Sequence, residues 1–347
     1  MHTRRPRYSG KNPRGFHQKY KELNPEQYAA QVQKVLASGK TPAGMHRPIM
    51  VEEVMARLRP VAGDVAVDCT LGGGGHTRAL LGRVLPGGRV IGLDVDPIEA
   101  PRTEGRLRSE GFGPESFVSH HGNFAGVHKA LTAAGYATAN IILADLGVSS
   151  MQLDNPDRGF SHKESGPLDM RMNPSRGVTA AQVIARESAE SLAALLGANA
   201  DEPHADLIAN ALKRHAASAE ATTTRVVDAL IRSALLAAFP GLTFAETTLS
   251  VRRAFQALRI VVNDEFAALD ALLRSLPQCL AAGGRVAILT FHSGEDRRVK
   301  KAFQVGLREG AYSALSDDLV RATAEECRAN PRAWSAKLRW AVRASSL

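Results

Sequence analysis

The sequence is poor in cysteine, and this scarcity excludes several kinds of site. Its 347 residues include only three cysteines, Cys69, Cys279 and Cys327, which lie far apart and form no CxxC pair. A chain that relied on disulfides or on a structural zinc ion would need paired or clustered cysteines. We therefore expect a protein of a reducing compartment with no metal site. Because 44% of the residues are hydrophobic, a core of ordinary size needs no such reinforcement.

Long apolar runs are also missing from the sequence. No stretch approaches the roughly 18 consecutive apolar residues that a membrane span requires. The first ten residues, MHTRRPRYSG, contain no apolar segment of the kind found in secretory signals. These absences predict a cytoplasmic protein with no membrane partner.

Acidic residues are scarce at the two ends of the chain. Residues 1–48 carry ten lysines and arginines against two glutamates, and residues 285–347 carry twelve basic residues against seven acidic ones. Two basic ends favour binding to a polyanion, although basic termini can also serve solubility alone. Aromatic residues make up only 5% of the chain, yet Tyr8, Phe16 and Tyr20 lie among the basic residues of the first end. Aromatic faces beside cations favour RNA as the polyanion.

Strand and helix patterns alternate through the first half of the chain. Short apolar strands are predicted at 65–68, 89–94, 117–121 and 140–145, and the pattern resumes at 285–292. Continuous apolar strands separated by helices are typical of a parallel sheet that is covered on both faces. With the usual right-handed crossovers, the sequence predicts a doubly wound α/β sheet.

A long helical segment interrupts this alternation after the fourth predicted strand. Residues 151–177 form a polar stretch rich in Asp, Pro, Gly and Arg, and residues 178–240 are alanine-rich with a helical pattern. We interpret residues 151–248 as an inserted loop and helical domain that binds substrate. We expect core helices over 247–282 to lead back to the sheet. The other expected parts are a basic arm and linker at 1–45, with a helix over 25–38, and a core made of 46–150 and 249–347.

Four successive glycines at 72–75 follow the first predicted strand and open a helix. Glycine permits close backbone approach to a ligand, and the N-terminus of a helix offers free N–H donors. Asp94 ends the second strand, where a carboxylate can accept both hydroxyls of a ribose. This arrangement fits NAD as well as S-adenosylmethionine, since a glycine loop followed by an acid is also the dinucleotide fingerprint. The unspaced glycines and Asp145, which ends the fourth strand, favour a methyltransferase over an NAD-dependent oxidoreductase.

Eight motifs that occur in a fixed order identify a family. They are HRPIMVEE at 46–53, DCTLGGGGHTR at 68–78, DLGVSSMQLD at 145–154, RGFS at 158–161, GPLDMRM at 166–172, FQALRI at 255–260, FHSGEDR at 291–297 and NPRAWSAKLR at 330–339. Together these motifs resemble the bacterial 16S rRNA cytosine-N4 methyltransferase family, called RsmH or MraW. The match runs from about residue 46 to 343. The basic extension before His46 resembles a divergent second copy found in some bacteria.

The resemblance implies a Rossmann-like class I methyltransferase core with an inserted helical domain, and S-adenosyl-L-methionine as the cofactor. It places the cofactor contacts on Gly74, Gly75, His76, Asp94, Phe124, Asp145 and Gln152. It also implies that the substrate is a cytidine of 16S rRNA near the decoding centre, so that the small ribosomal subunit is the partner; a homodimer is left open. A second interpretation is an RNA-binding ribosome-assembly factor with a vestigial cofactor site. The retained polar residues of that site argue against it.

Methylation of a cytidine N4 amine requires activation, because the lone pair of the nitrogen is conjugated with the ring. A hydrogen-bond acceptor that pulls the amine out of planarity frees the lone pair. DNA amino-methyltransferases use a [DNS]-P-P-[YFW] element after the fourth strand, and that place holds DLGVSS at 145–150 here. We therefore name Asp145 and Ser149 as candidate catalytic acceptors. The alternative is that Asp145 serves the cofactor alone.

Three further residues are candidates for substrate binding. Asp169 and Arg171, in the polar loop, suit the target base and a phosphate, but they also suit a plain salt bridge with each other. His292 ends the fifth predicted strand and is expected beside the pocket. Ser293, with Asp296 three residues later, is expected to cap the next helix.

Overall fold

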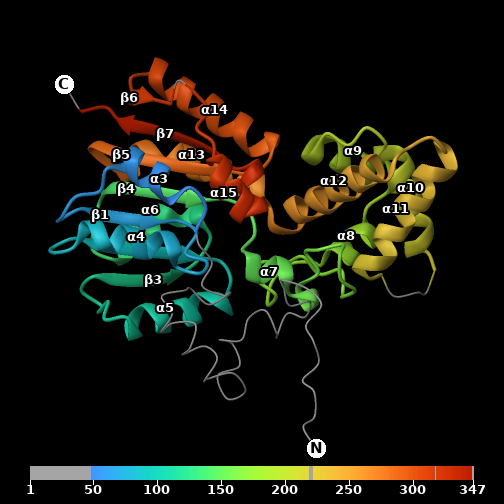
Figure 1. The fold of residues 1–347 in the computed structure, drawn as a ribbon, viewed down its shortest axis with the longest axis horizontal. Coiled ribbons are helices and arrows are strands. Elements are labelled where there is room, and N and C mark those ends of the chain that lie inside the picture. Colours follow the sequence, from blue (N-terminus) through green and yellow to red (C-terminus); the bar gives the residue numbers. More distant parts are fainter. Residues whose placement is uncertain (1–47, 219–221, 317, 346–347) are drawn as a thin grey trace, which may run out of the picture.

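The structure is a computed structural model that describes residues 48–218, 222–316 and 318–345. The basic arm expected at 1–45 and the helix expected over 25–38 lie outside these residues. Figure 1 shows two bodies side by side, a core built around a β-sheet and an insert built of helices.

Seven strands form one sheet in the order β3-β2-β1-β4-β5-β7-β6. The strands are β1 (Val65–Asp68), β2 (Arg89–Asp94), β3 (Phe117–His121), β4 (Ala139–Asp145), β5 (Leu280–Thr290), β6 (Tyr312–Leu315) and β7 (Lys337–Arg343). Strands β1 to β5 run parallel, whereas β7 is antiparallel to both β5 and β6. The strand order reverses between β1 and β4, and ligands bind outside the carboxyl ends of the strands at such a point. The predicted doubly wound, mostly parallel sheet is confirmed.

Helices cover both faces of the sheet, and each face has its own apolar core. One face carries α3 (Val51–Leu58), α4 (Gly75–Val84) and α5 (Glu99–Ser109), and the other carries α6 (Val127–Ala133), α13 (Glu265–Cys279) and α14 (Ser293–Arg308). Leu80 and Leu107 belong to the first core, and Leu272 and Phe303 belong to the second. Successive strand residues face opposite cores, as the alternating geometry of a strand requires. The inner strands β1, β2 and β4 are therefore mostly apolar, because both of their faces are buried.

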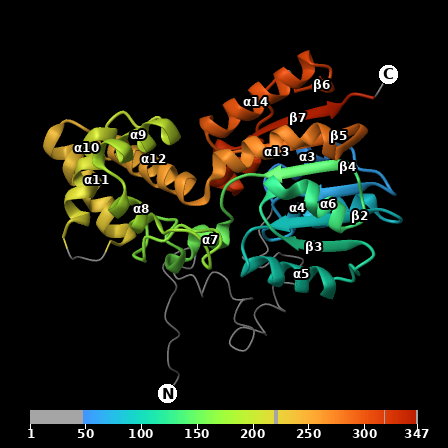
Figure 2. The ribbon, with the colours of Figure 1, turned by 180° about the vertical axis from the view of Figure 1, so that it is seen from behind.

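The insert has an apolar core of its own. Its helices are α8 (Ala180–Arg186), α9 (Ala189–Ala200), α10 (Ala205–Ala216), α11 (Thr224–Ala238) and α12 (Phe244–Asn263). The buried residues that join these helices, among them Leu196, Ile231 and Val251, all lie outside the sheet. Figure 2 shows the helices of the insert set apart from the strands.

The boundary between insert and core differs from the one expected after residue 248. That position falls within α12, a single helix of 20 residues that begins with a capping box between Thr243 and Glu246. The buried side chains of α12 from Val251 to Leu258 pack in the core of the insert, whereas α13 packs against the sheet. The helices expected over 247–282 are thus divided between the two bodies, because α12 continues the insert for another 15 residues beyond the expected boundary.

Asn263 fastens the end of α12 to the polar loop of the insert. Its Oδ1 accepts the N–H of Met172 at 2.7 Å, and its Nδ2 donates to the carbonyls of Met170 and Arg259 at 2.8 and 2.9 Å. Asp264 follows in a left-handed conformation with φ +51°, and α13 begins immediately after it. The joint between α12 and α13 is therefore a tight turn at Asn263 and Asp264, and hydrogen bonds of the Asn263 side chain hold it in place.

Short segments line the carboxyl edge of the sheet. They are η2 (Phe124–Gly126), α7 (Ser150–Asp154), η3 (Pro156–Arg158), α15 (Ala324–Ala329) and η4 (Pro331–Ser335). Figure 1 places α15 on the side of the core that faces the insert. Among the described residues, no helix is both long and apolar enough to cross a membrane.

Candidate active site

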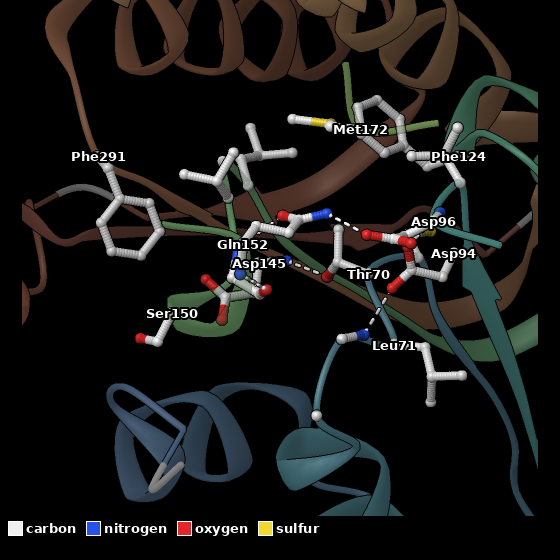
Figure 3. Close-up of a pocket in the computed structure, with 18 of the residues that line it drawn as sticks. Thr70, Leu71, Asp94, Asp96, Phe124, Asp145, Ser150, Gln152, Met172 and Phe291 are labelled. Carbon is white, nitrogen blue, oxygen red and sulfur yellow. Dashed lines mark hydrogen bonds between the residues drawn. The ribbon is translucent and has the colours of Figure 1, made fainter. Parts of the chain in front are cut away.

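A pocket of about 350 Å³ opens at the carboxyl edge of the sheet (Figure 3). Its walls come from the loops after β1 to β5, from the joint between α12 and α13, and from η4. Seven of the residues expected at the site line it, namely Gly75, His76, Asp94, Phe124, Asp145, Ser149 and Gln152. Four others, Gly74, Asp169, Arg171 and His292, are not among its lining residues. The volume lies in the range of sites that bind small molecules.

Two glycines of the run after β1 are required by the backbone and by close packing. Gly74 caps the N-terminus of α4 with φ +72°, a left-handed conformation that glycine adopts without strain. A Cβ at Gly74 would lie 2.8 Å from the methyl group of Thr103, and a Cβ at Gly75 would lie 2.8 Å from Pro48. Gly74 therefore serves the packing of α4 against α5, whereas the other three glycines of the run line the pocket.

Asp94, at the end of β2, is held in place by backbone donors. Its Oδ2 accepts the N–H of Gly72 at 2.7 Å, and its Oδ1 accepts the N–H of Asp96 at 2.9 Å. Burial raises the pKa of Asp94 to about 6, and the two N–H donors oppose this rise. A carboxylate offers about four acceptor positions. Asp94 therefore keeps the capacity to accept hydrogen bonds from hydroxyl groups of a ligand.

A buried hydrogen-bond network supports Asp94. At the centre of this network is Asp96, which the sequence analysis did not identify as a site residue. Oδ2 of Asp96, a fully buried residue, accepts from Nε2 of Gln152 and from Nη1 of Arg158, both at 2.8 Å. Arg158 also donates to the carbonyl of Met172 at 2.8 Å. The side-chain nitrogen of Gln152, an expected cofactor contact, is thus bonded to the protein. The available signals were the position of Asp96, two residues after Asp94, and the RGFS motif that contains Arg158.

Asp145 ends β4 and lies near the middle of the pocket (Figure 3). Its N–H donates to Oγ1 of Thr70 at 2.7 Å, and its Oδ2 lies 3.6 Å from Nδ1 of His76. Its Oδ1 is buried and has no hydrogen-bond partner among the described residues. Burial raises the pKa of Asp145 to about 6, and His76 opposes the rise. Because a buried polar atom without a partner is costly, this oxygen indicates a ligand that donates a hydrogen bond.

Ser149, the second candidate acceptor, is the N-cap of the short helix α7. Its Oγ accepts the N–H of Gln152 at 3.2 Å, and its own N–H donates to Oε1 of Gln152 at 3.0 Å. This reciprocal arrangement is a capping box. The hydroxyl oxygen of Ser149 already has a structural donor, so Asp145 is the better placed of the two acceptors.

Two aromatic side chains mark the ends of the pocket. Phe124 begins η2, a turn whose N-cap Asn123 accepts the N–H of Ala125 at 2.9 Å. Phe291 follows β5 directly and was not singled out by the sequence. In Figure 3 the two rings lie at opposite ends, with Asp145 between them. The pocket therefore suits two flat ligand groups, with an acidic oxygen at the place where they meet.

Asp169 and Arg171 pair with each other outside the pocket lining. Nη2 of Arg171 donates to Oδ2 of Asp169 at 2.6 Å, and its Nε donates to Oδ1 at 2.8 Å. Although burial opposes it, the bonds from Arg171 lower the pKa of Asp169. The observed arrangement is the plain salt bridge. A role for either residue in substrate binding stays a prediction.

His292, and not Ser293, is the N-cap of α14. The backbone is still extended at His292, with φ −141°, and becomes helical only at Ser293, which corrects the expected cap. Glu295 accepts the N–H groups of Phe291 and His292 at 2.8 and 3.4 Å, and it lies 3.2 Å from Nε2 of His292. Burial acts against it, yet His292 lowers the pKa of Glu295. His292 thus acts on the pocket through Glu295, which lines it.

Glu265, His292 and Glu295 bring three potential ligand atoms within 4.8 Å of one another. Arg259 reaches into this group, and its Nε and Nη2 donate to Glu265 at 2.7 and 2.9 Å. A guanidinium in this place neutralises a carboxylate and repels a cation. We interpret the group as a charge network that supports the pocket wall.

The sequence matches the MraW methylase family over residues 43–344. It is 47% identical to "Ribosomal RNA small subunit methyltransferase H 1" of Lachnoclostridium phytofermentans, an alignment that covers 99% of this chain and 94% of the relative. It is also 47% identical to "Ribosomal RNA small subunit methyltransferase H 2" of Alkaliphilus metalliredigens, over 98% of this chain and 97% of the relative. "Ribosomal RNA small subunit methyltransferase H" of Sorangium cellulosum is 43% identical, over 86% of this chain and 90% of the relative.

These matches confirm the family that the eight motifs indicated, and two relatives with numbered names extend over nearly the whole chain. They also decide between the two cofactor interpretations that the glycine loop left open. A methylase needs a methyl donor, and an NAD-dependent oxidoreductase does not. The chain belongs to the MraW methylase family.

Proposed function

We propose that the protein transfers the methyl group of S-adenosylmethionine to the exocyclic N4 amine of a cytidine in the RNA of the small ribosomal subunit. The relatives named above are ribosomal RNA small subunit methyltransferases, and the alignments cover 94% and 97% of the first two. The observation that carries the proposal is Oδ1 of Asp145, a buried acceptor without a partner among the described residues, placed between the aromatic ends of one pocket.

The residues at one end of the pocket fit S-adenosylmethionine. Asp94 has acceptor capacity left for the hydroxyls of the ribose, and Phe124 lies on the same side of the pocket, where its ring suits the adenine (Figure 3). The glycine loop presents backbone without side chains, so the methionine part of the donor can lie close to it. S-adenosylmethionine supplies a methyl group that is activated by its bond to a positively charged sulfur.

Asp145 performs the chemical task that the target amine requires. Its ionised Oδ1 accepts a hydrogen bond from the N4 amine and draws the N–H out of the plane of the base. The nitrogen lone pair is then free to form the new N–C bond while the C–S bond breaks, and the surplus proton of the amine passes to Oδ1. Since its pKa is about 6, Asp145 is ionised at neutral pH. Much of the rate comes from holding the reacting atoms in line.

Phe291 positions the base at the other end of the pocket. The segment after β4, DLGVSS at 145–150, lacks the aromatic residue that DNA amino-methyltransferases carry there. Phe291 lines the pocket from the end of the neighbouring strand β5, and its ring supplies the missing stacking face. A base within a duplex cannot reach a buried carboxylate, so the target cytidine enters unpaired and turned out of its stack.

The partner that this function requires is the small ribosomal subunit with its 16S rRNA. The basic residues of 1–48, all of which lie outside the described residues, give the chain a region suited to RNA phosphates. A cytoplasmic location and a homodimer stay predictions from the sequence.

The test is methyl transfer from tritiated S-adenosylmethionine to small subunits that lack the modification. The labelled RNA is digested to nucleosides and analysed by mass spectrometry, and we expect N4-methylcytidine at one position. A label on carbon 5 of cytosine would contradict the proposed chemistry. No label at any stage of subunit assembly would instead favour an RNA-binding assembly factor with a vestigial cofactor site.

A further inference from the structure

Trp334 is an exposed aromatic side chain at the rim of the pocket. It lies in η4 and is 66% exposed, whereas its neighbour Ala333 is 1% exposed. The residues on either side of this pair, Arg332 and Ser335, both line the pocket. Because consecutive Cα atoms are about 3.8 Å apart, the indole begins within one residue of the pocket wall. Tryptophan is usually buried over most of its surface, so an open indole in this position is unusual.

The pairing of β5 with β7 places Trp334 near the substrate end of the pocket. The two strands are antiparallel, and Thr290 is paired with Lys337. Phe291 follows Thr290, and Trp334 lies three residues before Lys337, so both leave the same edge of the sheet. Phe291 lines the pocket, whereas Trp334 faces solvent. An aromatic ring inside the pocket thus has a second aromatic ring outside it on the same edge.

The segment that carries Trp334 is firmly held. Nη2 of Arg332 donates to Oδ1 of Asp154 at 2.7 Å, and its Nη1 contacts the hydroxyl of Ser150, so that η4 is fastened to α7. Asn330 caps η4, and its Oδ1 accepts the N–H of Arg332 at 3.2 Å. Figure 1 shows the preceding helix α15 between the sheet and the insert. The backbone that carries the indole is therefore held in place, so that little backbone freedom is lost when the indole binds a flat partner.

The other tryptophan of the chain, Trp340, has a structural role and serves as a comparison. Trp340, in β7, is half-buried, and the guanidinium of Arg57 lies 5.7 Å from its ring centre. Among the described residues, no aromatic ring or guanidinium packs on Trp334 in a comparable way. The packing of the described residues accounts for Trp340 but leaves the face of Trp334 open.

We propose that Trp334 stacks on the unpaired base next to the target cytidine and so positions the RNA strand at the pocket. The inference rests on the proposed function. A nucleotide that turns its base into the pocket exposes the face of its neighbour in the strand, and an indole at the rim covers that face. Stacking of this kind tolerates any base because every base has a π-face. Trp334 is thus a positioning residue for the RNA, while Phe291 and Asp145 contact the target base.

The test compares Trp334→Ala with Trp334→Phe in two assays. Filter binding of labelled, undermethylated small subunits gives the Kd without any methyl transfer, and steady-state transfer gives KM and kcat. For Trp334→Ala we expect the Kd and the KM for subunits to rise about 10- to 100-fold, with kcat and the KM for S-adenosylmethionine nearly unchanged. Trp334→Phe should recover most of the affinity, since it restores a stacking face.

Val61→Ala is the control, because Val61 is a 60% exposed apolar residue that precedes β1, at the edge of the sheet opposite to the pocket. It should leave the Kd for subunits unchanged. An unchanged Kd for Trp334→Ala would overturn the proposal, as would a loss that appears in kcat or in cofactor affinity instead. If the wild-type protein transfers no methyl group, the proposed function fails, but the Kd comparison still decides whether Trp334 binds RNA.

Discussion

The two ends of the pocket differ in how far their acidic groups are satisfied before any ligand arrives. At one end, both oxygens of Asp94 accept backbone N–H groups, and Oδ2 of Asp96 accepts from two side chains. In the middle, toward Phe291, Oδ1 of Asp145 is buried and accepts nothing from the described residues. The protein itself therefore satisfies the acidic groups at the Asp94 end of the pocket, whereas Asp145 keeps a free acceptor for a ligand. Under the proposed function, the donor for this acceptor is the N4 amine of the target cytidine.

The largest effect is expected when Asp145, the acceptor without a partner, is changed. Asp145→Asn should lower kcat by about 10²- to 10⁴-fold, the usual contribution of a group that takes up a proton in the reaction. The affinity for S-adenosylmethionine should change little. Single-turnover methyl transfer and titration calorimetry would measure the two quantities separately. A loss of cofactor affinity with an unchanged rate would mean that Asp145 serves the cofactor alone.

Changing the satisfied carboxylate should give the opposite pattern with a smaller effect. Asp94→Ala removes the acceptor for the ribose hydroxyls and leaves two buried N–H groups unpaired, so cofactor affinity should fall by about 10- to 100-fold. The affinity for small subunits should stay the same. The control is Glu52→Ala, which removes an exposed acid of α3. If Asp94→Ala weakened subunit binding instead, the division between the two ends would be wrong.

The acidity of Asp145 sharpens the comparison, because rate and stability should respond to pH in opposite directions. Burial raises its pKa from 3.8 to about 6 in the folded protein. At saturating cofactor, kcat should fall by about tenfold for each pH unit below 6, since only the ionised carboxylate accepts the amine proton. The contribution of this group to stability is full below pH 3.8 and is lost as the pH rises through 6, because folding favours the protonated form.

These two profiles are measured as kcat against pH and as the free energy of urea unfolding against pH. Asp145→Asn does not titrate and is the reference for both. Coincident stability profiles of the variant and the wild type between pH 4 and 7 would show that Asp145 does not carry the raised pKa.

Ser149→Ala should have the smallest effect of the series. The substitution removes the side-chain half of the capping box of α7, which lowers stability by about 1 kcal/mol. The rate should stay close to that of the wild type, because Asp145 is intact. Thermal unfolding and kcat would be measured on the same preparation. A fall in kcat as large as that of Asp145→Asn, with little change in unfolding, would make the hydroxyl a second acceptor.

The sequence was most informative about the end of the pocket at Asp94, because the positions of its residues depend on segments that are close together in the sequence. A strand, a glycine turn and a helix fix where Gly72 and Asp94 lie, and the register of β1 with β2 brings the two loops together. Even there, the structure gives Gly74 a role in helix packing that the sequence analysis did not predict. A Cβ at this position would lie 2.8 Å from Thr103, and such a contact between two helices cannot be seen in the sequence.

The substrate end could not be predicted in the same way, because it depends on contacts between distant segments. Phe291 and Trp334 leave the same edge of the sheet only because β5 pairs with β7. The division of helices failed for a related reason. The apolar stripe of α12 shows that one of its faces is buried, but the stripe is the same whether that face packs on other helices or on a sheet.

Asn263 decides which piece of this molecule could be exchanged as a module. Its side chain forms hydrogen bonds between the end of α12 and the backbone of the loop at Met170 and Met172. The structural boundary of the insert therefore lies at Asn263 and not at residue 248, where the sequence pattern changes. A chimera cut near residue 248 would divide α12 and separate its buried residues from Val251 to Leu258 from the rest of the apolar core of the insert. A graft that moves the insert to another methylase should therefore run through Asn263 and take the loop with it.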